Sequence, residues 1–272
     1  MIVFPNCKIN LGLHILQKRP DGFHDLETVF YPVPLQDALE VVQSPSPTDD
    51  IQFTTSGLEI DSSVENNICV KAYRLLKKDF PQLPAIKLHL LKVIPSGAGL
   101  GGGSSDGAFT LTLLNKKFNL EISQNRLIKY AVELGSDCPF FIKNQPCYAT
   151  GRGENLEEIE LDLSNYKIVL VNPKIHISTG RAFSKITPNN QRTGIKDIIK
   201  KPAEQWRDVL KNDFEETVFA EHPATKQVKD ELYQRGAVYA SMSGSGSTVY
   251  GLFEKNMDVQ LDFPSVYFVY TV

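Results

Sequence analysis

A run of glycines near the middle of the chain restricts its fold and its chemistry more than any other stretch. Pro95 to Ser105 reads Pro-Ser-Gly-Ala-Gly-Leu-Gly-Gly-Gly-Ser-Ser, with five glycines within the seven residues from Gly97 to Gly103. Glycine adopts positive φ without strain and has no Cβ to keep a ligand away from the backbone. Because so many glycines lose much conformational entropy on ordering, we expect their bare amides to have a use.

The segments that flank this loop predict a strand before it and a helix after it. Ile86 to Ile94 alternates apolar and polar side chains at its start, which is typical of a strand. The segment after the loop places apolar side chains on one helical face, at Ala108, Leu111, Leu114 and Phe118. Its N-cap is expected at Ser104, Ser105 or Asp106. This arrangement aims unpaired N–H groups and the positive end of the helix dipole at one point, so we interpret it as a loop that binds a nucleotide triphosphate.

Other interpretations of the glycines stay open. Gly97, Gly99 and Gly102 satisfy G-x-G-x-x-G, the pattern of a dinucleotide-binding turn, but that pattern alone has low specificity. Here three consecutive glycines and two serines close the loop, and it lies deep in the chain rather than after a first strand. No Gly-Lys-Ser/Thr ends it, so it is not a Walker A loop. A loop that only turns the chain is the remaining alternative.

Composition is typical of an ordinary globular protein and gives no sign of a nucleic-acid or membrane partner. The 272 residues can bury the core of one large domain or two smaller ones, and 42% of them are hydrophobic. A net charge of −3 without a basic run argues against nucleic-acid binding. No apolar run is long enough to span a membrane, and Lys8 and Asn10 interrupt any signal peptide.

The cysteines indicate a reducing compartment. They are scattered without the spacing of a metal site, at Cys7, Cys69, Cys138 and Cys147. Such thiols are typically buried and reduced in cytosolic proteins, so we expect a cytoplasmic protein. No feature of the chain indicates an obligate protein partner.

A lysine interrupts the first predicted strand. Met1 to Gln17 is rich in apolar residues, but Lys8 stands among them where a strand should be half buried. The lysine either snorkels from a sheet edge or points into a site beside Asn10. This segment alone does not decide between the two interpretations.

Two stretches of the N-terminal part predict turns or loops. Arg19-Pro-Asp-Gly-Phe-His24 begins with a turn, since Pro presets φ and Gly takes positive φ. Phe23 and His24 then either stack on a flat ligand ring or are a packed aromatic residue and a solvated histidine. The composition of Ser44 to Asp50 predicts a surface loop.

An aspartate follows a predicted helix and precedes an apolar run. It lies in Gly135-Ser-Asp137-Cys-Pro-Phe-Phe. Asp137 is either the N-cap of a short helix with Pro139 in its first turn, or a poorly solvated carboxylate suited to accept a proton. Further upstream, Asn67 precedes a helix predicted from Ile68 to Phe80.

A second small-residue turn lies near the end of the chain. Met242-Ser-Gly-Ser-Gly-Ser-Thr248 is followed by the predicted strand Val249 to Phe253. On its own the turn is typical of a hairpin loop. It is also suited to close over phosphates bound at the first glycine loop.

Together these segments resemble the GHMP kinase superfamily. That superfamily has an N-terminal lysine motif, a Pro-x-Gly-x-Gly-Leu-Gly-Ser/Gly-Ser-Ser phosphate loop and a C-terminal Gly-Ser-Gly loop. They correspond here to Asn6-Cys-Lys8-Ile-Asn10-Leu, Pro95 to Ser105, and Met242 to Thr248.

Within the superfamily, the chain resembles the family of kinases that act on 4-diphosphocytidyl-2-C-methyl-D-erythritol, an isoprenoid-pathway compound. The resemblance rests on Lys8-Ile-Asn10-Leu followed by Arg19 to His24, on the triple glycine Gly101 to Gly103, and on the Asp137 motif. It extends over nearly the whole chain. Phe23 stands where the family often has tyrosine, which keeps a stacking ring but removes a hydroxyl.

The resemblance implies an α/β (α+β) fold with two domains. These are an N-terminal ribosomal-S5-like domain, expected over residues 1–156, and a C-terminal ferredoxin-like domain over residues 157–272, with the active site between them. It also implies transfer of the γ-phosphoryl group of ATP, with Mg²⁺, to the 2-hydroxyl of the methylerythritol moiety. The metal is expected to bridge phosphate oxygens and to contact a serine hydroxyl, without an assigned ligand residue.

The resemblance also assigns roles to single residues. Asp137 matches the catalytic aspartate that takes the hydroxyl proton, and Lys8 its partner. The ATP-binding residues are expected to be Asn67, Lys92, Pro95, Ser96, Gly97, Ala98, Gly99, Leu100, Gly101, Gly102, Gly103, Ser104 and Ser105. Those on the substrate side are Asn10, Phe23, His24, Thr179 and Phe183, with Phe23 and Phe183 sandwiching the cytosine and His24 reading its edge.

Three rival functions can be distinguished. Another kinase of the superfamily, acting on homoserine, mevalonate or a sugar, has no use for the cytosine clamp of Phe23 and His24. A nucleotide-binding protein without catalysis does not need both Lys8 and Asp137. A dinucleotide-dependent oxidoreductase rests only on the G-x-G-x-x-G pattern, and it predicts binding of NAD rather than ATP with Mg²⁺.

Overall fold

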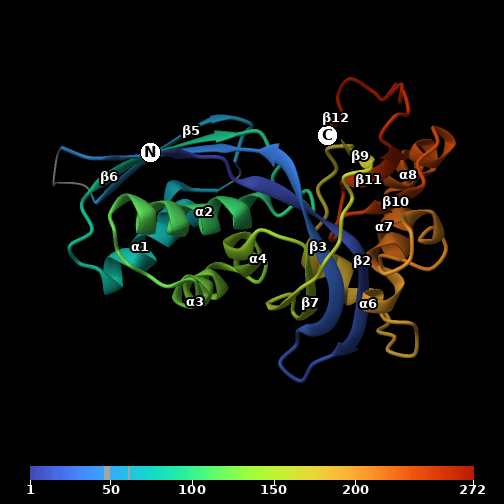
Figure 1. Cartoon of the computed structure of the whole chain (residues 1–272), viewed down its shortest axis with the longest axis horizontal. Helices are drawn as coiled ribbons and strands as arrows, with labels where there is room; N and C mark the ends of the chain where they lie inside the picture. The colour runs from blue at the N-terminus through green and yellow to red at the C-terminus, as the bar shows by residue number, and fades with distance from the viewer. Residues whose placement is uncertain (46–49, 61) are drawn as a thin grey trace. The chain divides into compact units, whose positions relative to one another are not determined.

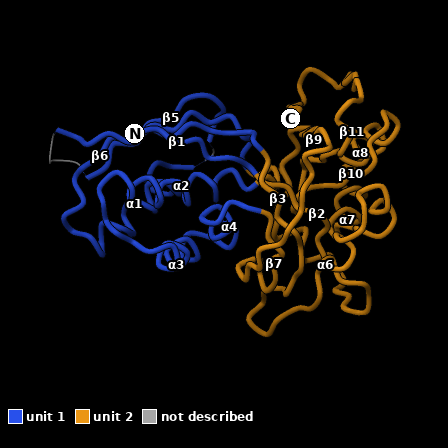
Figure 2. The backbone as a smooth tube through the Cα atoms, viewed as in Figure 1, with its two compact units in different colours: residues 1–7, 34–96, 101–145 blue, residues 8–33, 97–100, 146–272 orange. Residues whose placement is uncertain are grey.

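The computed structural model describes residues 1–45, 50–60 and 62–272. The described residues divide into two compact units that interleave along the sequence (Figure 2). The segments of unit 1 are Met1–Cys7, Pro34–Ser96 and Gly101–Gln145, and those of unit 2 are Lys8–Val33, Gly97–Leu100 and Pro146–Val272. The domain boundary expected after residue 156 stays a prediction, and most of the loop expected at 44–50 lies outside the described residues.

Unit 1 contains a mixed sheet whose strands, in the order β1-β4-β6-β5, are Ile2–Val3, Ala38–Gln43, Ile86–Lys92 and Ile51–Gly57. β6 pairs antiparallel with β4 and parallel with β5. The predicted strand thus exists and ends at Lys92. Its even positions from Ile86 to Lys92 are buried, so Lys92 occupies an inward position of the alternation.

Helices lie on one face of this sheet (Figure 1). They are the 3₁₀ turn η1 (Val64–Asn66), α1 (Ile68–Asp79), α2 (Gly102–Lys117), α3 (Gln124–Leu134) and α4 (Cys138–Lys143). The predicted α1 is confirmed, with the Asn67 side chain accepting a hydrogen bond from Cys69 N at 2.9 Å. The α1 and α2 helices pack closely, because a Cβ on Gly107 would lie 2.7 Å from Ile68 Cγ1.

The N-cap expected for the helix after the loop was wrong. Its N-cap is Gly101, at φ 69°, so Ser104, Ser105 and Asp106 lie inside the helix. The glycines themselves enter the helical conformation, which starts the helix earlier than the apolar pattern indicates. As a result no side chain caps α2 within the described residues.

Unit 2 contains most of a sheet with the strand order β2-β3-β7-β8. These strands are Asn6–Lys18, His24–Gln36, Cys147–Gly151 and Asn155–Glu158. The predicted Pro-Asp-Gly turn joins β2 to β3, with Gly22 at φ 88° and its N–H donating to Arg19 O at 3.1 Å. That turn prediction is confirmed.

A second sheet of unit 2 is antiparallel throughout, in the order β10-β11-β9-β12. Its strands are Tyr239–Met242, Val249–Glu254, Tyr166–Asn172 and Phe268–Thr271. The α7 (Phe214–Glu221) and α8 (Pro223–Gln234) helices lie beside it (Figure 1), and α8 packs on β10 and β11. The remaining short helices of the unit are α5 (Thr179–Ser184), α6 (Ile195–Ile198) and η2 (Ala203–Gln205).

The turn from Ser243 to Thr248 joins β10 to β11, which pair from Met242 opposite Val249. The hairpin expected there is confirmed. In the part of the chain that the structure describes, no helix combines the length and apolar character that crossing a membrane requires.

Candidate active site

The backbone conformation of the loop from Pro95 to Ser105 requires glycine at several positions. Gly97, Gly99 and Gly101 have φ values of 63°, 80° and 69°, a region that other residues enter only with strain. A Cβ on Gly99 would lie 1.9 Å from the carbonyl oxygen of Ser243, whereas one on Gly103 would meet no described atom within 4 Å. Backbone amides therefore border open space at the start of α2.

The second small-residue turn packs on the part of the loop that belongs to unit 2. Thr248 N donates to Ala98 O at 3.2 Å, and the Ser243 hydroxyl donates to Gly99 O at 2.8 Å. The Asn212 side chain supports this turn by donating to Met242 O at 2.7 Å and Gly244 O at 2.9 Å. Sequence reasoning missed Asn212, which belongs to none of the motifs identified in the sequence.

Lys8 points inward and does not snorkel. Lys8 is only 3% exposed, and its ammonium donates a hydrogen bond to Asn10 Oδ1 at 2.5 Å. The same ammonium lies 4.8 Å from the ring centroid of Phe30. The backbone N–H of Lys8 donates to Leu100 O at 3.0 Å, so this lysine is positioned against the glycine loop.

Asn10 is held by further bonds that orient its amide. Its Nδ2 donates to Thr28 Oγ1 at 3.0 Å, and that hydroxyl donates to Gly12 O. Its backbone N–H donates to the Ser243 hydroxyl at 3.2 Å, and the Tyr250 hydroxyl donates to its carbonyl at 2.8 Å. Thr28 and Tyr250 carried no sequence signal, since Thr28 lies on the neighbouring strand β3 and Tyr250 on β11 of the other sheet, 240 residues away from Asn10.

A buried ion cluster of Asp37, Lys92 and Asp106 lies in unit 1. The Lys92 ammonium donates to Asp37 Oδ2 at 2.5 Å and to Asp106 Oδ2 at 2.8 Å, and each of these residues is at most 2% exposed. A Cβ on Gly102 would lie 3.0 Å from that ammonium, so the cluster lies directly against the end of the glycine loop. Lys92 was expected near the nucleotide, and it lies inside this cluster.

Burial and charge act together on the cluster. Burial raises the pKa of Asp106 to about 8, and the nearby Asp37 carboxylate adds to this, whereas Lys92 opposes it. Burial lowers the pKa of Lys92, but the two carboxylates outweigh it and the net shift is upward. Lys92 is therefore charged at neutral pH.

Asp137 follows α3 and occupies the N-cap position of α4, with Pro139 in the first turn. The position expected for it is confirmed, but among the described residues its side chain makes no capping hydrogen bond. The neighbouring Cys138 is fully buried, and burial raises the pKa of its thiol to about 12 despite a hydrogen bond with Ser104. Cys138 thus behaves as a small apolar side chain.

The aromatic residues of the predicted substrate side lie in unit 2. His24 and Phe183 stack, with ring centroids 5.0 Å apart and planes at 19°. Phe183 also contacts Phe214 edge-on at 4.8 Å. Phe23 is 53% exposed, and the Arg152 guanidinium carbon lies 4.9 Å from its ring centroid. Described contacts therefore pair Phe183 with His24 rather than with Phe23.

Two more features complete the substrate side. Burial and the charge of Lys18 lower the pKa of His24, which leaves its ring neutral at neutral pH. Thr179 begins α5, and its hydroxyl shares a hydrogen bond of 2.9 Å with that of Ser245 in the second small-residue turn.

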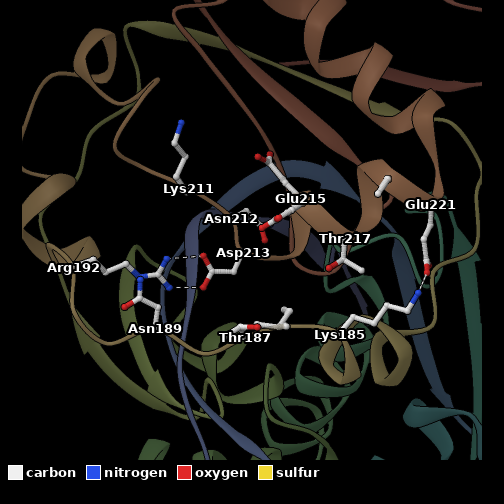
Figure 3. A pocket seen from close by; sticks show the side chains of 13 residues that line it. Lys185, Thr187, Asn189, Arg192, Lys211, Asn212, Asp213, Glu215, Thr217 and Glu221 are labelled. Carbon is white, nitrogen blue, oxygen red and sulfur yellow. Dashed lines mark hydrogen bonds and ion pairs between the residues drawn. The ribbon is translucent and has the colours of Figure 1, made fainter.

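Unit 2 contains a pocket of about 770 Å³, and none of the predicted site residues is among the described residues that line it (Figure 3). Its Arg192 guanidinium pairs with Asp213 and its Lys185 ammonium with Glu221. Each of these two cations therefore has a carboxylate partner.

Comparison with known families matches two regions of the chain. Residues 67–145 match the family described as GHMP kinases N terminal domain, and residues 195–265 match GHMP kinases C terminal. The first region contains the glycine loop and Asp137, and the second contains the turn from Ser243 to Thr248.

Whole-chain comparison gives closer similarities. The chain is 54% identical to a Bacteroides thetaiotaomicron protein named 4-diphosphocytidyl-2-C-methyl-D-erythritol kinase, over 93% of this chain and 92% of that one. A crystal structure of 4-(cytidine 5'-diphospho)-2C-methyl-D-erythritol kinase superposes with a TM-score of 0.80 at 30% identity, covering 93% and 90% of the two chains. The Methanococcus jannaschii mevalonate kinase shares the fold, with a TM-score of 0.68 at 15% identity over 94% and 91%.

Proposed function

The chain belongs to the 4-diphosphocytidyl-2-C-methyl-D-erythritol kinases of the GHMP kinase superfamily, and from this membership we propose how it carries out its reaction. It is an ATP-dependent small-molecule kinase, a phosphotransferase with an alcohol acceptor. It transfers the γ-phosphoryl group of ATP to the 2-hydroxyl of 4-diphosphocytidyl-2-C-methyl-D-erythritol, a step of the methylerythritol phosphate route to isoprenoids.

The observation that carries this proposal is the glycine loop that leads from β6 into the uncapped N-terminus of α2. Its bare amides and the helix dipole provide positive potential for the ATP phosphates, the residues from Pro95 to Ser105 forming the cradle. Phosphoryl transfer needs little covalent chemistry from a protein, so positioning and charge stabilisation supply most of the rate. Asn67 and Lys92 are proposed to act beside the cradle.

Asp137 and Lys8 are the proposed catalytic pair. Asp137 accepts the proton of the attacking hydroxyl, and Lys8 orients the reacting groups or stabilises charge on the transferred phosphoryl. The hydrogen bond from Lys8 to Asn10 supports this role, since it directs a buried ammonium to a defined place. Asn10 would thus act on the substrate and on Lys8 at once.

Mg²⁺ is proposed as the second cofactor, held mainly by phosphate oxygens. Among the described residues, His, Cys, Asp and Glu side chains form no group of three that could hold a metal. The Ser105 hydroxyl is buried and has no hydrogen-bond partner in the described chain, and an oxygen ligand of this kind fits Mg²⁺. When bound, the metal would neutralise charge on the phosphates.

The cytidine moiety is proposed to bind at His24 and Phe183, with Phe23 and Thr179 nearby. Because His24 and Phe183 stack on each other, a base that enters between aromatic rings must separate them or use Phe23 as its second face.

Replacing His24 by alanine should raise KM for the cytidine substrate by about 10- to 100-fold, the worth of a stacking and hydrogen-bonding contact. KM for ATP should stay within about twofold, because the phosphate loop is unchanged. Steady-state kinetics with each substrate varied in turn measure both values. His89→Ala is the matched control, since His89 bonds only hydroxyls of Thr54 and Ser56 among its described partners. Equal effects on both substrates would remove His24 from the clamp.

The reaction itself is tested by ADP release from ATP and Mg²⁺ with the cytidine substrate, beside mevalonate and homoserine. We expect turnover with the cytidine compound alone. Activity with a control substrate but not with the cytidine compound would keep the phosphate loop and overturn the substrate assignment. A location in the cytoplasm and activity without a protein partner belong to the same proposal.

A further inference from the structure

The first turn of α2 has no side-chain cap, and the glycine loop before it does not supply one. A side-chain cap fixes the first turn of a helix but occupies its free amides. The cap of α2 is Gly101, so the amides stay available to a ligand while the first turn lacks that anchor. Five nearby glycines make the segment still more flexible before it folds. Another group must hold it in place.

Asp37 has the contacts to do so. It lies between β3 and β4, its backbone N–H donates to Pro5 O at 2.8 Å, and its side chain is completely buried. Its Oδ1 accepts from Val93 N at 2.6 Å and Ile94 N at 2.8 Å, the last residues before the loop. These bonds fix the start of the loop.

The other oxygen of Asp37 reaches the far end of the loop through a lysine. Oδ2 accepts from the Lys92 ammonium, which also bonds Asp106 in the first part of α2. A Cβ on Gly102 would lie 2.8 Å from Ile94 Cγ2 and 3.0 Å from that ammonium, so the two ends of the loop are in close contact here. The cluster therefore joins the exit of β6 to the entry of α2.

We infer that Asp37 is a positioning residue that holds both ends of the phosphate loop. It bonds Val93 and Ile94 directly and reaches α2 through Lys92, and in this way it fixes the amides of the loop in place before ATP binds. This inference rests on the proposed function of the loop. Burying charged groups is unfavourable, since desolvation costs several kcal/mol per ion, so we expect the buried cluster to bring a benefit in return. The benefit is that little loop ordering remains to be done when the nucleotide binds.

Replacing each aspartate of the cluster by asparagine should have different effects on the hydrogen bonds of the loop. Asp37→Asn leaves a single acceptor oxygen for donors on both sides and turns an NH₂ group toward either the backbone amides or the ammonium. In Asp106→Asn the amide oxygen can still accept from Lys92, because Oδ1 of Asp106 has no hydrogen-bond partner in the described chain. The two variants therefore form a matched comparison, in which only Asp37→Asn disturbs the support of the loop.

We expect Asp37→Asn to weaken ATP binding by about 10- to 100-fold, as expected when a binding loop is displaced by about 1 Å. Asp106→Asn should stay within about threefold of the unaltered protein. Calorimetry of the full chain with ATP and Mg²⁺, and separately with CDP as a probe of the cytidine side, measures both. An equal loss in both variants, or an equal loss of ATP and CDP binding in Asp37→Asn, would overturn the inference.

Hydrogen exchange of the unaltered protein keeps the inference testable should Asp37→Asn not fold. The amides of Val93 and Ile94 should be protected without ATP and unchanged by its addition. Free exchange of these amides until ATP is added would contradict presetting by Asp37. Failure of the unaltered protein to bind ATP would instead count against the proposed function, and the exchange result would still decide on the cluster.

Discussion

Replacing Asp137 by asparagine should lower kcat by about 10²- to 10⁴-fold, the usual contribution of a positioned acid or base. Asparagine keeps the size of the side chain but cannot take the hydroxyl proton. ADP release with saturating substrates measures kcat, and calorimetry with ATP and Mg²⁺ measures nucleotide binding, which should change by less than about threefold. The phosphate loop is untouched, so binding and chemistry separate.

Asp162→Asn is the control for this experiment, since Asp162 is an exposed carboxylate whose described bonds go to Ser164. It should leave kcat unchanged. If the Asp137→Asn variant binds ATP more weakly and unfolds at a lower temperature, but keeps its kcat at saturating ATP, then Asp137 stabilises α4 and does not take part in the reaction.

Replacing Gly99 by alanine should disrupt the packing of the two small-residue loops. The residue lies at φ 80°, and its Cβ would lie 1.9 Å from Ser243 O and 3.2 Å from Gly246 N. These neighbours are backbone atoms, so the collision cannot be relieved by a rotamer change. We expect a loss of at least about 2 kcal/mol of stability, a fall of roughly 5 °C in Tm, and ATP binding weakened by at least about 10-fold.

Gly103→Ala is the matched control for stability. It lies in α2, and its Cβ would meet no described atom within 4 Å. Alanine is favoured over glycine in a helix by about 1 kcal/mol, so Tm should stay or rise slightly. Thermal unfolding and ATP calorimetry of both variants decide the matter. A Gly99→Ala protein with unchanged Tm and ATP affinity would mean that the contact between the loops is dispensable.

Part of the site follows from local sequence because its physics is local. A glycine run between an alternating strand and an apolar helical face predicts β6, the loop and α2 without any distant residue. The Pro-Asp-Gly turn and the turn after Met242 are equally local. The N-cap of α2 was missed because the glycines enter the helix themselves, which an apolar pattern does not reveal.

The supporting residues could not be predicted in this way. Asp37 bonds Ile94 across a sequence separation of 57 residues, and Tyr250 bonds Asn10 across 240. Neither residue belongs to a recognisable motif. Such contacts depend on which strands and helices become neighbours, and a single sequence carries little information about that.

By itself, the sequence indicated the phosphate loop, because glycine conformation and hydrophobic periodicity act over a few residues. The kinase superfamily and the residues proposed to bind ATP and substrate followed from the resemblance of its motifs to a known family. Only the tertiary structure decided that Lys8 is buried on Asn10, that Lys92 lies in an ion cluster with Asp37, and that His24 stacks on Phe183. Burial and side-chain partners are properties of the packed chain, since they depend on atoms that only folding brings within a few ångströms.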